Sequence, residues 1–484
     1  MRVTTARESS ARDQAAIAAG TPSAALMARA GEAAALEIAR RFAFQLIHPV
    51  AIFAGPGNNG GDGWVVARAL ALRGAAVRVI PAGDPRTPDA LAARAAALAT
   101  PGVTAATEAG DARLVVDALL GTGTAGAPRD AIRDAIAVVR ADLTLTFGTL
   151  KRALLLARDA AGAIAVLDIG LPDEGGAGAP PALVTADWVR SRLPAIAAYA
   201  HKGTRMKLAI VGGQAGMAGA TILAARAAMR SGIGMVRLVV ARESIAVVQA
   251  AEPHALAAAW PVRDEDARDA VADWADVVLL GPGLGDSPAG RAIADRVLSA
   301  WRGPVVIDAD GLNVFKGAAA RLGALLAGRA ALLTPHAAEF ARLAGSDTTE
   351  VLTHRFDVGA AIARATGAVV LLKGVPTVIA SPAGQRWVSA TGTPALAAAG
   401  SGDLLGGIAA TLLAHTGDPA FAGAAAAWAH GRAAEIASAG RSVRGVTLED
   451  VERAISDVWQ FAEPGLVPPV LAELPAAGGD AGRR

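Results

Sequence analysis

The sequence predicts an α/β protein with two doubly wound domains, each a three-layer arrangement of a mostly parallel sheet between helices. Apolar runs of strand length alternate with Ala-rich helical stretches along most of the chain. A single linker-like segment, PDEGGAGAPP at 172–181, interrupts the alternation, which then restarts. A length of 484 residues also exceeds that of one ordinary domain. We therefore expect domains over 1–180 and 181–462, followed by a flexible Pro/Gly/Ala-rich tail over 463–484.

The individual elements follow from the same apolar pattern. In the first domain we expect a helical start over 15–44 and strands at 50–54, 76–80, 114–118, 143–147 and 164–168. In the second domain, the segments KLAIVGG, MVRLVVA, DVVLLGPG, PVVIDADG, ALLTP, AVVLLKG and TVIAS predict strands. One long helix is expected to run from the Gly-rich turn at 400–402 towards Ser438.

Composition restricts the chemistry. The chain has no Cys and seven scattered His, which excludes disulfides and thiolate sites and argues against zinc. The formal net charge is +2, no Lys/Arg run suits a nucleic acid, and no apolar stretch approaches the ~18 residues of a membrane span. The N-terminal segment lacks the apolar core of a signal peptide. We expect a cytoplasmic protein that works with carboxylates, Lys, backbone amides and hard cations on small molecules.

The segment FAGPGNNGGDGW at 53–64 contains the spelling G-x-G-x-x-G, the dinucleotide fingerprint of oxidoreductases. With 55 Gly in 484 residues, about 0.7 such spellings are expected by composition alone, so the fingerprint carries little information. More informative are Asn58, Asn59 and Asp62, in the turn between strand and helix. Their oxygens suit a hard cation, a sugar hydroxyl or an amide. The alternative is an Asx-rich turn that only caps the helix.

Together with VVDALLGTG, the segment AGPGNNGGDGWVVARAL resembles the N-terminal half of YjeF-type NAD(P)H-hydrate epimerases, which interconvert the R and S epimers of hydrated NAD(P)H. The resemblance implies that the loop beginning at Gly121, with Gly123, wraps the substrate phosphates, and that Asn59 and Asp117 ligate K⁺. The residues it places against the hydrated dinucleotide are Asn58, Asn59, Gly60, Gly61 and Asp62.

One departure from this family is clear. Its members carry a further strand that ends in a motif like D-I-P-S-G-x-D, which supplies a Ser ligand for K⁺ and an acid near the reacting carbon. Nothing of this kind lies between Asp117 and Asp142, although ADLTLTFGTLKRALLL and AIAVLDIGLP beyond it match. We therefore predict an internal deletion that weakens the sheet, the cation site and the epimerase activity.

Four segments of the second domain place polar residues at the ends of predicted strands or at the starts of predicted helices. VVIDADGLN carries Asp308 and Asp310, and LLTPHAAEF carries His336 and Glu339. Lys373, in LLKG, is notable because the chain has only five Lys against 41 Arg. In GSGD at 400–403, the amides of a helix N-terminus form an anion hole, and its carboxylate, Asp403, is placed to take a proton from a hydroxyl that receives a phosphate. The alternatives are a capping role for Asp403 and a solvated strand end for Lys373.

This set resembles the ribokinase-like superfamily and, within it, the C-terminal NAD(P)H-hydrate dehydratase half of bifunctional repair enzymes. The resemblance implies that ADP with Mg²⁺ phosphorylates the hydrate hydroxyl, and that phosphate then leaves to regenerate NAD(P)H. Asp403 would be the base, and the turn of Gly400, Ser401 and Gly402 would hold the transferring phosphate. The nucleotide would be lined by Lys373, Gly374, Val375, Pro376 and Thr377, and the hydrated dinucleotide would contact Ala220, Gly283, His336 and Asp403.

Two other readings remain open at this stage. A ribokinase-like kinase for a hydroxymethylpyrimidine or thiazole alcohol shares the G-S-G-D chemistry, but it does not explain the fused NNGGDG domain. Alternatively, the first domain is a non-catalytic ligand-binding or assembly module. Ala-rich helices with few charges also favour a homo-oligomer.

Overall fold

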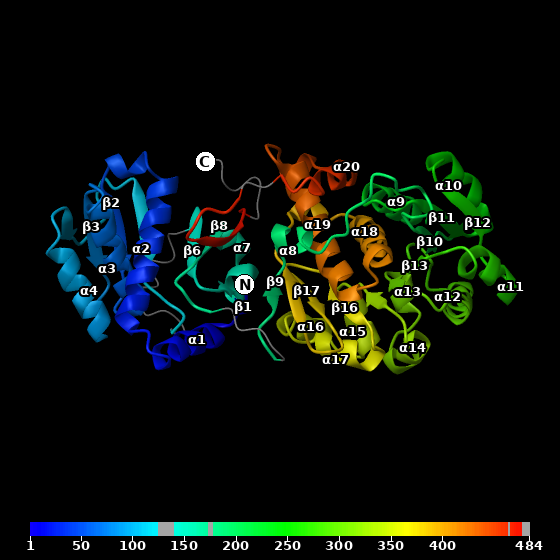
Figure 1. The fold of residues 1–484 in the computed structure, drawn as a ribbon, viewed down its shortest axis with the longest axis horizontal. Helices are drawn as coiled ribbons and strands as arrows, with labels where there is room; N and C mark the ends of the chain where they lie inside the picture. The colour runs from blue at the N-terminus through cyan, green and yellow to red at the C-terminus, as the bar shows by residue number, and fades with distance from the viewer. Residues whose placement is uncertain (124–139, 173–177, 463–464, 477–484) are drawn as a thin grey trace. The chain divides into compact units, whose positions relative to one another are not determined.

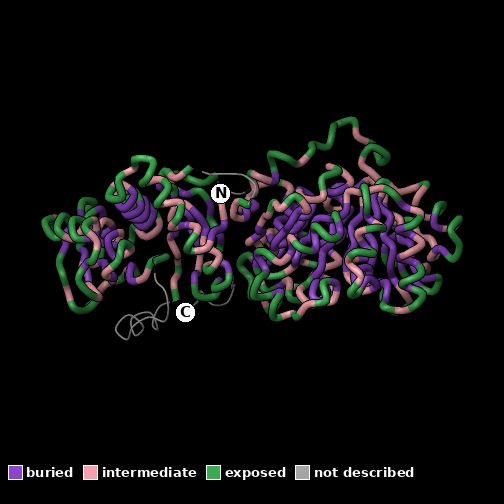
Figure 2. The backbone as a smooth tube through the Cα atoms, turned by 90° about the horizontal axis from the view of Figure 1, so that it is seen from below, coloured by how far each residue is buried: buried purple, intermediate pink, exposed green. Residues whose placement is uncertain are grey.

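The computed structural model describes residues 1–123, 140–172, 178–462 and 465–476. The chain divides into two compact units, of which the first comprises Met1–Glu174 with Gly465–Ala476 and the second begins at Gly175. Buried residues fill the interior of each unit, and exposed residues lie mainly in loops and on outer helix faces (Figure 2). Both units are α/β with mostly parallel sheets, so the predicted fold class is confirmed. No helix in the described part of the chain is both long and apolar enough to cross a membrane.

The second unit is built on a sheet of ten described strands in the order β12-β11-β10-β13-β14-β15-β16-β17-β18-β9 (Figure 1). Strands β10 to β16 are parallel, and β17 runs antiparallel to both β16 and β18. The strands are β9 (Ala182–Leu183), β10 (Lys207–Val211), β11 (Met235–Val240), β12 (Leu256–Ala259), β13 (Val277–Leu280), β14 (Val305–Ile307), β15 (Ala331–Leu333), β16 (Val369–Leu372), β17 (Thr377–Ala380) and β18 (Arg386–Ser389).

Helices cover both faces of this sheet because its strands are apolar on both sides. In β10, Leu208 and Ile210 join the core on one face, and Ala209 and Val211 join the core on the other. The first face packs against α8 (Ala186–Arg190), α9 (Ala218–Arg230), α10 (Ile245–Ala251), α18 (Ser401–Thr416), α19 (Pro419–Ser438) and α20 (Leu448–Val458). The second packs against α12 (Pro288–Ala300), α13 (Asp310–Asn313), α14 (Ala319–Leu326), α15 (Ala337–Ala344), α16 (Thr348–Thr353) and α17 (Gly359–Thr366), and the short α11 (Asp264–Ala267) lies beside α12.

The order of the strands reverses between β10 and β13, which is where ligands bind in open α/β sheets. The loops that follow these two strands are in close contact. Gly213 N donates to Pro282 O (2.9 Å) and Gln214 N donates to Gly283 O (2.8 Å). A Cβ at Gly212 would lie 1.9 Å from Pro282 O, so only glycine permits this approach.

The single long helix predicted from the turn at 400–402 towards Ser438 is wrong. The structure has two helices, because Gly417 adopts a left-handed conformation (φ +66°) that ends α18. Asp418 then caps α19, whose first residue is Pro419.

The first unit contains two larger sheets, β4-β3-β2-β5 and β19-β8-β6, and a small β1-β7 pair (Figure 1). The strands are β1 (Val3–Thr4), β2 (Val50–Ala54), β3 (Val77–Pro81), β4 (Val103–Ala105), β5 (Leu114–Ala118), β6 (Leu143–Phe147), β7 (Leu150–Lys151), β8 (Ala163–Leu167) and β19 (Val470–Leu474). The helices are α1 (Ala6–Ala18), α2 (Ser23–Arg41), α3 (Asn58–Ala71), α4 (Pro88–Leu98), α6 (Arg152–Leu156) and α7 (Arg158–Ala161), so the helical start predicted over 15–44 is two helices.

Within the described residues, β5 pairs only with β2, and β6 pairs only with β8. The parallel sheet of the first unit is therefore in two pieces, and β5 forms an edge at which Val115 is 47% exposed. The division lies where the sequence analysis predicts a lost strand. Most of that interval, 124–139, lies outside the described residues.

The flexible tail predicted over 463–484 is wrong for residues 470–474. These residues form β19, which runs antiparallel to β8 and belongs to the first unit. Val470, Ala472 and Leu474 are buried, and the residues between them are exposed, as in a strand with one face on a core. The surrounding Pro, Gly and Ala hide this alternation in the sequence.

Deletion of residues 465–484 tests the role of β19. Burial of Val470 and Leu474 contributes roughly 1.5–3 kcal/mol each, so we expect the first unit to lose roughly 3–6 kcal/mol of stability. In scanning calorimetry, only the transition of the first unit should move to lower temperature. Deletion of 477–484 alone is the matched control and should leave both transitions in place. Equal profiles for the two deletions would contradict a structural role for β19.

Candidate active site

A buried ion network lies at the carboxyl ends of β14 and β16. Asp308 follows β14 and Lys373 follows β16, and Lys373 Nζ lies 2.7 Å from Asp308 Oδ1. Glu339, in the first turn of α15, completes the network at 3.7 Å from Lys373 Nζ. Asp308 is only 1% exposed, so its charge depends on this ammonium group. Parallel strands thus deliver three charged groups to one edge of the sheet.

The charges around Lys373 fix the protonation of its neighbours. Burial lowers the pKa of Lys373, but the charges of Asp308 and Glu339 outweigh burial and raise it, so the ammonium form is retained. His336 caps α15 by accepting a hydrogen bond from Ala338 N at Nδ1 (3.1 Å), and its Nε2 lies 3.3 Å from Glu339 Oε1. Burial lowers the pKa of His336, so this ring is neutral at pH 7.

The G-S-G-D turn forms an anion hole at the start of α18. Gly400 has φ +93°, a left-handed conformation that turns the chain into the helix. Within the described residues, the N–H groups of Gly400 and Gly402 donate no hydrogen bond, whereas Ser401 N donates to Ala398 O (3.2 Å). A Cβ at Gly402 would lie 3.4 Å from Lys373 Nζ, so the ammonium group stands directly beside these amides. The arrangement suits a phosphate group.

Asp403, in the first turn of α18, has the properties of a general base. Burial, reinforced by the charge of Asp308 and opposed by that of Lys373, raises the pKa of Asp403 to about 7. No side-chain hydrogen bond caps α18, so the capping alternative has no support in the structure. A carboxyl group that gains and loses its proton near neutral pH, beside an anion hole, can accept a proton from an alcohol during phosphoryl transfer.

The loop predicted to line the nucleotide, 373–377, follows β16. Lys373 N donates to Pro335 O (2.9 Å), and Thr377 Oγ1 donates to Gly374 O (3.0 Å), which closes the turn. The guanidinium group of Arg355 supports the loop by donating a hydrogen bond to Val375 O. A Cβ at Gly374 would lie 2.3 Å from Arg355 Nη2, so glycine is required for this approach. Val375 is exposed, whereas Pro376 is buried.

Two residues predicted to contact the hydrated dinucleotide lie together at the reversal of the strand order. A Cβ at Gly283 (φ +60°) would lie 3.3 Å from the Cβ of Ala220, in the first turn of α9. Asp310 holds this loop in place, because its Oδ2 accepts a hydrogen bond from Gly285 N (2.8 Å). The same helix reaches the anion hole, since a Cβ at Gly400 would lie 2.6 Å from Leu223 Cδ1.

The sequence analysis assigned no role to Asp308, Glu339 or Arg355. Glu339 had a signal, because it stands three residues after His336 in a capping-box arrangement that the structure shows. Asp308 was recognised only as an acid at a strand end. No feature of the sequence predicts the role of Arg355, because nothing distinguishes it from the rest of the 41 arginines.

The sequence analysis placed Asn58, Asn59 and Asp62 in a turn between strand and helix, but in the structure they belong to α3, which begins at Asn58. Asn59 Nδ2 donates to Leu120 O (3.1 Å), and a Cβ at Gly121 would lie 3.0 Å from the Cβ of Asn59. Asn58 Oδ1 accepts a hydrogen bond from Thr87 Oγ1 (2.7 Å). Asp117 lies on β5 opposite Phe53 of β2, so it is at the same end of the sheet as the loop that follows β2. Gly123 is exposed, and the structure gives it no contact with these residues.

The sequence analysis missed Asp13, whose charge acts on both Asp62 and Lys151, and it missed Lys151 itself. Burial, together with the charge of Asp13 on α1, raises the pKa of Asp62 to about 8. Burial lowers the pKa of Lys151 to about 8, and its Nζ donates to Phe147 O (2.7 Å) and Thr149 O (3.0 Å). These groups exchange protons near neutral pH, which is the property an acid or base in a site requires. Asp13 and Lys151 lie far from the NNGGDG segment in sequence, so no local pattern connects them to it.

The residues expected to ligate K⁺ form only part of a binding site. Asn59 and Asp117 share an edge, but Asp117 Oδ1 already accepts a hydrogen bond from Leu119 N (2.8 Å). No group of three or more His, Asp or Glu among the described residues is arranged to hold a metal ion. The Ser that completes the family's K⁺ site has no counterpart identified in this sequence. The donor set is incomplete, so we assign K⁺ no step.

Comparisons with known proteins agree with both halves of this geometry. The family described as NAD(P)H-hydrate dehydratase matches residues 208–457, and that described as YjeF-related protein N-terminus matches residues 23–142. The bifunctional NAD(P)H-hydrate repair enzyme Nnr of Moorella thermoacetica is 35% identical, over 89% of this chain and 91% of that protein. The enzyme of the same name from Escherichia coli is 33% identical, over 88% of this chain and 87% of that protein.

A solved structure matches the second unit. The ADP/ATP-dependent NAD(P)H-hydrate dehydratase from Bacillus subtilis, co-crystallized with ATP/Mg²⁺, is 30% identical and superposes with a TM-score of 0.52. The match covers 58% of this chain and 99% of the other. The match to the YjeF-related N-terminus ends at residue 142, so β6, β8 and β19 lie beyond it.

The carboxyl group of Asp403 should take up a proton with a midpoint near pH 7 rather than near 4. Because the negative charge of Asp308 raises this pKa, Asp308→Asn should move the midpoint to lower pH. Difference infrared spectroscopy, with Asp403→Asn to assign the band, measures both values. Asp187→Asn, an exposed control (side chain 80% exposed), should change nothing. A midpoint that is the same in wild type and Asp308→Asn would contradict the coupling.

Proposed function

Because the chain belongs to the family of bifunctional NAD(P)H-hydrate repair enzymes, we propose that its second unit dehydrates (S)-NAD(P)H hydrate with ADP as co-substrate. We propose further that its first unit interconverts the R and S epimers. The observation that carries the first proposal is Asp403, a carboxyl group with a pKa of about 7 beside the amides of Gly400 and Gly402 and the ammonium group of Lys373.

In this proposal each group has a role. Asp403 accepts the proton of the hydrate hydroxyl. The oxygen of that hydroxyl attacks the terminal phosphorus of ADP, and AMP leaves. The amides of Gly400 and Gly402, with Lys373, stabilise the charge that develops on the transferring phosphate. Phosphate then leaves the ring carbon while the neighbouring carbon loses a proton, which restores the double bond of NAD(P)H. Ala220, Gly283 and His336 are proposed to contact the hydrated dinucleotide.

Mg²⁺ is expected to enter with the nucleotide. The described residues contain no cluster of three or more acidic or His ligands, and Mg²⁺ is often held by substrate phosphates together with few protein groups. When bound, Mg²⁺ neutralises phosphate charge. The protein's own contribution is the positioned base, the amides and Lys373.

The epimerase proposal rests on the first turn of α3 and on Asp62. A carboxyl group with a pKa raised to about 8 can donate a proton at pH 7 and accept it back, which an exchange of configuration requires. The interrupted sheet beside β5 argues for a reduced rate. The interrupted sheet also favours the alternative, in which the first unit is a non-catalytic binding module.

We also propose that the chain acts in the cytoplasm and as a homo-oligomer. The absence of Cys fits a reducing compartment. Large apolar side chains on the surface support subunit contacts, and Phe44 (87% exposed) and Ile47 (79% exposed) lie together after α2.

Asp403→Asn should lower the rate of NADH recovery by ~10²–10⁴-fold, the usual contribution of a general base. The assay follows the absorbance of NADH regenerated from its hydrate with ADP, and then with ATP. The control Asp187→Asn should keep the wild-type rate. Absence of recovery by the wild type with either nucleotide would refute the dehydratase proposal, and a near-normal rate for Asp403→Asn would refute the assignment of the base.

An epimer mixture of hydrated NADH should be consumed in two phases. The fast phase is the S epimer, and the slower phase is the R epimer after conversion by the first unit. Asp62→Asn should reduce the slow phase to the spontaneous rate and leave the fast phase unchanged, because Asp62 belongs to the other unit. If the wild-type slow phase already equals the spontaneous rate, the first unit is not an epimerase and is instead the binding module.

A further inference from the structure

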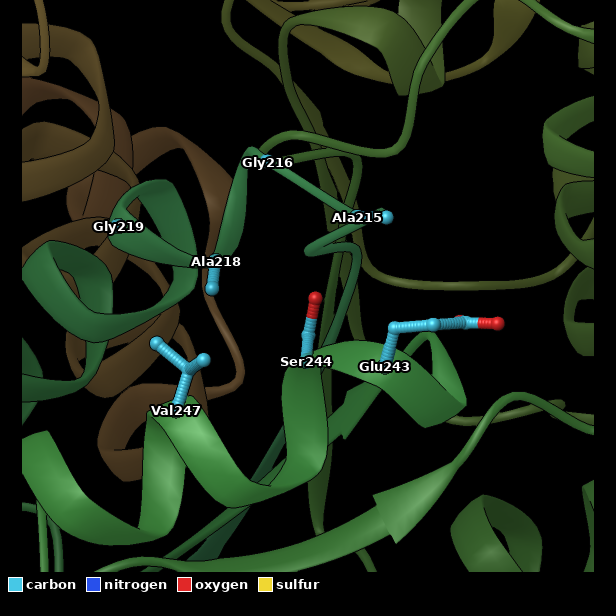
Figure 3. A pocket seen from close by; sticks show the side chains of 7 residues that line it. All are labelled: Ala215, Gly216, Ala218, Gly219, Glu243, Ser244 and Val247. Atoms are coloured by element: carbon cyan, nitrogen blue, oxygen red, sulfur yellow. The ribbon is translucent and has the colours of Figure 1, made fainter.

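A cavity of ≈ 260 Å³ in the second unit lies between the loop after β10 and the starts of α9 and α10 (Figure 3). Two polar side chains belong to its lining. The hydroxyl group of Ser244 already donates to Gln214 O (3.2 Å), and the carboxylate of Glu243 extends away from the space. The described residues of this cavity therefore lack the side chains that would hold a polar ligand.

A buried contact beside the anion hole is different, because it joins a residue without an assigned role to the proposed reaction. Nε2 of His430, on α19, lies 3.3 Å from Ser401 Oγ, and the two residues are 7% and 6% exposed. Burial, with a smaller effect of the charge of Lys373, lowers the pKa of His430 to about 4, so the ring is neutral at pH 7. The pair is therefore a neutral hydrogen bond at the start of α18.

Ser401 is the residue of the G-S-G turn that has a side chain to anchor it. Gly400 and Gly402, on either side, have none, and glycine leaves the backbone free to adopt several conformations. The amide nitrogen of Gly402 is bonded to the carbonyl carbon of Ser401 in one planar group, so a fixed Ser401 limits the directions in which Gly402 N–H can point. The contact with His430 thus restrains an amide that the proposed reaction uses.

The same helix holds the other end of the segment that leads into this turn. Thr391 Oγ1 donates to Trp428 O (3.0 Å), and Gly392 N donates to Glu435 Oε1 (2.9 Å). Trp428 and Glu435 both belong to α19, which packs against α18 (Figure 1). The segment is therefore attached to α19 at both ends, and His430 makes the attachment at the anion hole.

We propose that His430 is a positioning residue of the dehydratase reaction and that it acts through the hydroxyl group of Ser401. By holding Ser401, it keeps the amides of the anion hole directed at the transferring phosphate. The inference rests on the dehydratase function proposed above. Donors that are fixed before the reaction stabilise its transition state without a further cost of ordering them, so loss of the contact should lower kcat.

The test measures kcat and KM for the recovery of NADH from its S hydrate with ADP. His430→Leu removes the hydrogen bond and should lower kcat by about 10- to 100-fold, a part of the ~10²–10³-fold cost of losing one donor of an anion hole. The KM for ADP should change little, because the loop at 373–377 is unchanged. His430→Gln keeps a donor and an acceptor near the position of Nε2, so it should restore most of the wild-type kcat.

Ser401→Ala separates an effect through Ser401 from a general effect on packing. If His430 acts through the hydroxyl group, Ser401→Ala lowers kcat by a similar factor, and the addition of His430→Leu lowers it no further. A His that only fills the space between α18 and α19 would give factors that multiply. The matched control is His415→Leu, which removes the contact of His415 Nε2 with Arg205 O (3.4 Å) in the last turn of α18 and should keep the wild-type kcat.

Scanning calorimetry shows whether the second unit of each variant is folded. If His430→Leu unfolds it, the inference still requires a low kcat in Ser401→Ala and a high one in His430→Gln. A wild-type kcat in His430→Leu or in Ser401→Ala, or factors that multiply in the double variant, overturns the inference and leaves the dehydratase proposal standing. Absence of NADH recovery by the wild type overturns both.

Discussion

The second unit depends on the ion pair between Asp308 and Lys373. The pair joins the ends of two strands that are not neighbours in the sheet, since β15 lies between them. Loss of either partner leaves a buried charge without compensation, which costs about 3–5 kcal/mol. The pair also fixes the position of the anion hole, because Lys373 Nζ stands beside Gly402. Stability and the placement of the phosphate site therefore rest on the same contact.

The same pair modifies the pKa of Asp403, which burial raises: the charge of Asp308 adds to the effect of burial and that of Lys373 opposes it. One ammonium group faces the carboxylates of Asp308, Glu339 and Asp403, and His336 does not compensate because its pKa is lowered by burial. The site thus holds more negative than positive charge, and a proton on Asp403 relieves the excess near neutral pH. Under the proposed function, Asp403 is the group that accepts the proton given up by the hydroxyl of the substrate. Burial is the largest cause of the raised pKa of Asp403, and the excess of neighbouring negative charge adds to it.

The sequence was informative where chemistry follows the end of a strand. Lys373 could be assigned because it follows a strand, and Asp403 because it stands in the first turn of a helix that G-S-G opens. The support of the nucleotide loop by Arg355, and the approach of Asp13 to Asp62, could not be foreseen, since both join segments by tertiary packing alone. β19 escaped notice because its partner, β8, is about 300 residues away in the sequence. The break at Gly417 did have a signal, in the Gly-Asp-Pro that follows Thr416.

The two units differ in how their sites are supported. In the second unit, every strand that carries a site residue has neighbours on both sides, so each loop starts from a fixed point. In the first, Asp117 lies on β5, which is paired on one side only within the described residues. An edge strand is free to shift and to exchange its hydrogen bonds with water. A site that spans β5 and α3 is therefore less rigid than one built at the centre of a sheet. Since a catalyst loses rate as its groups lose their positions, we expect the interrupted sheet to slow epimerisation and to leave the proposed chemistry at Asp403 unchanged.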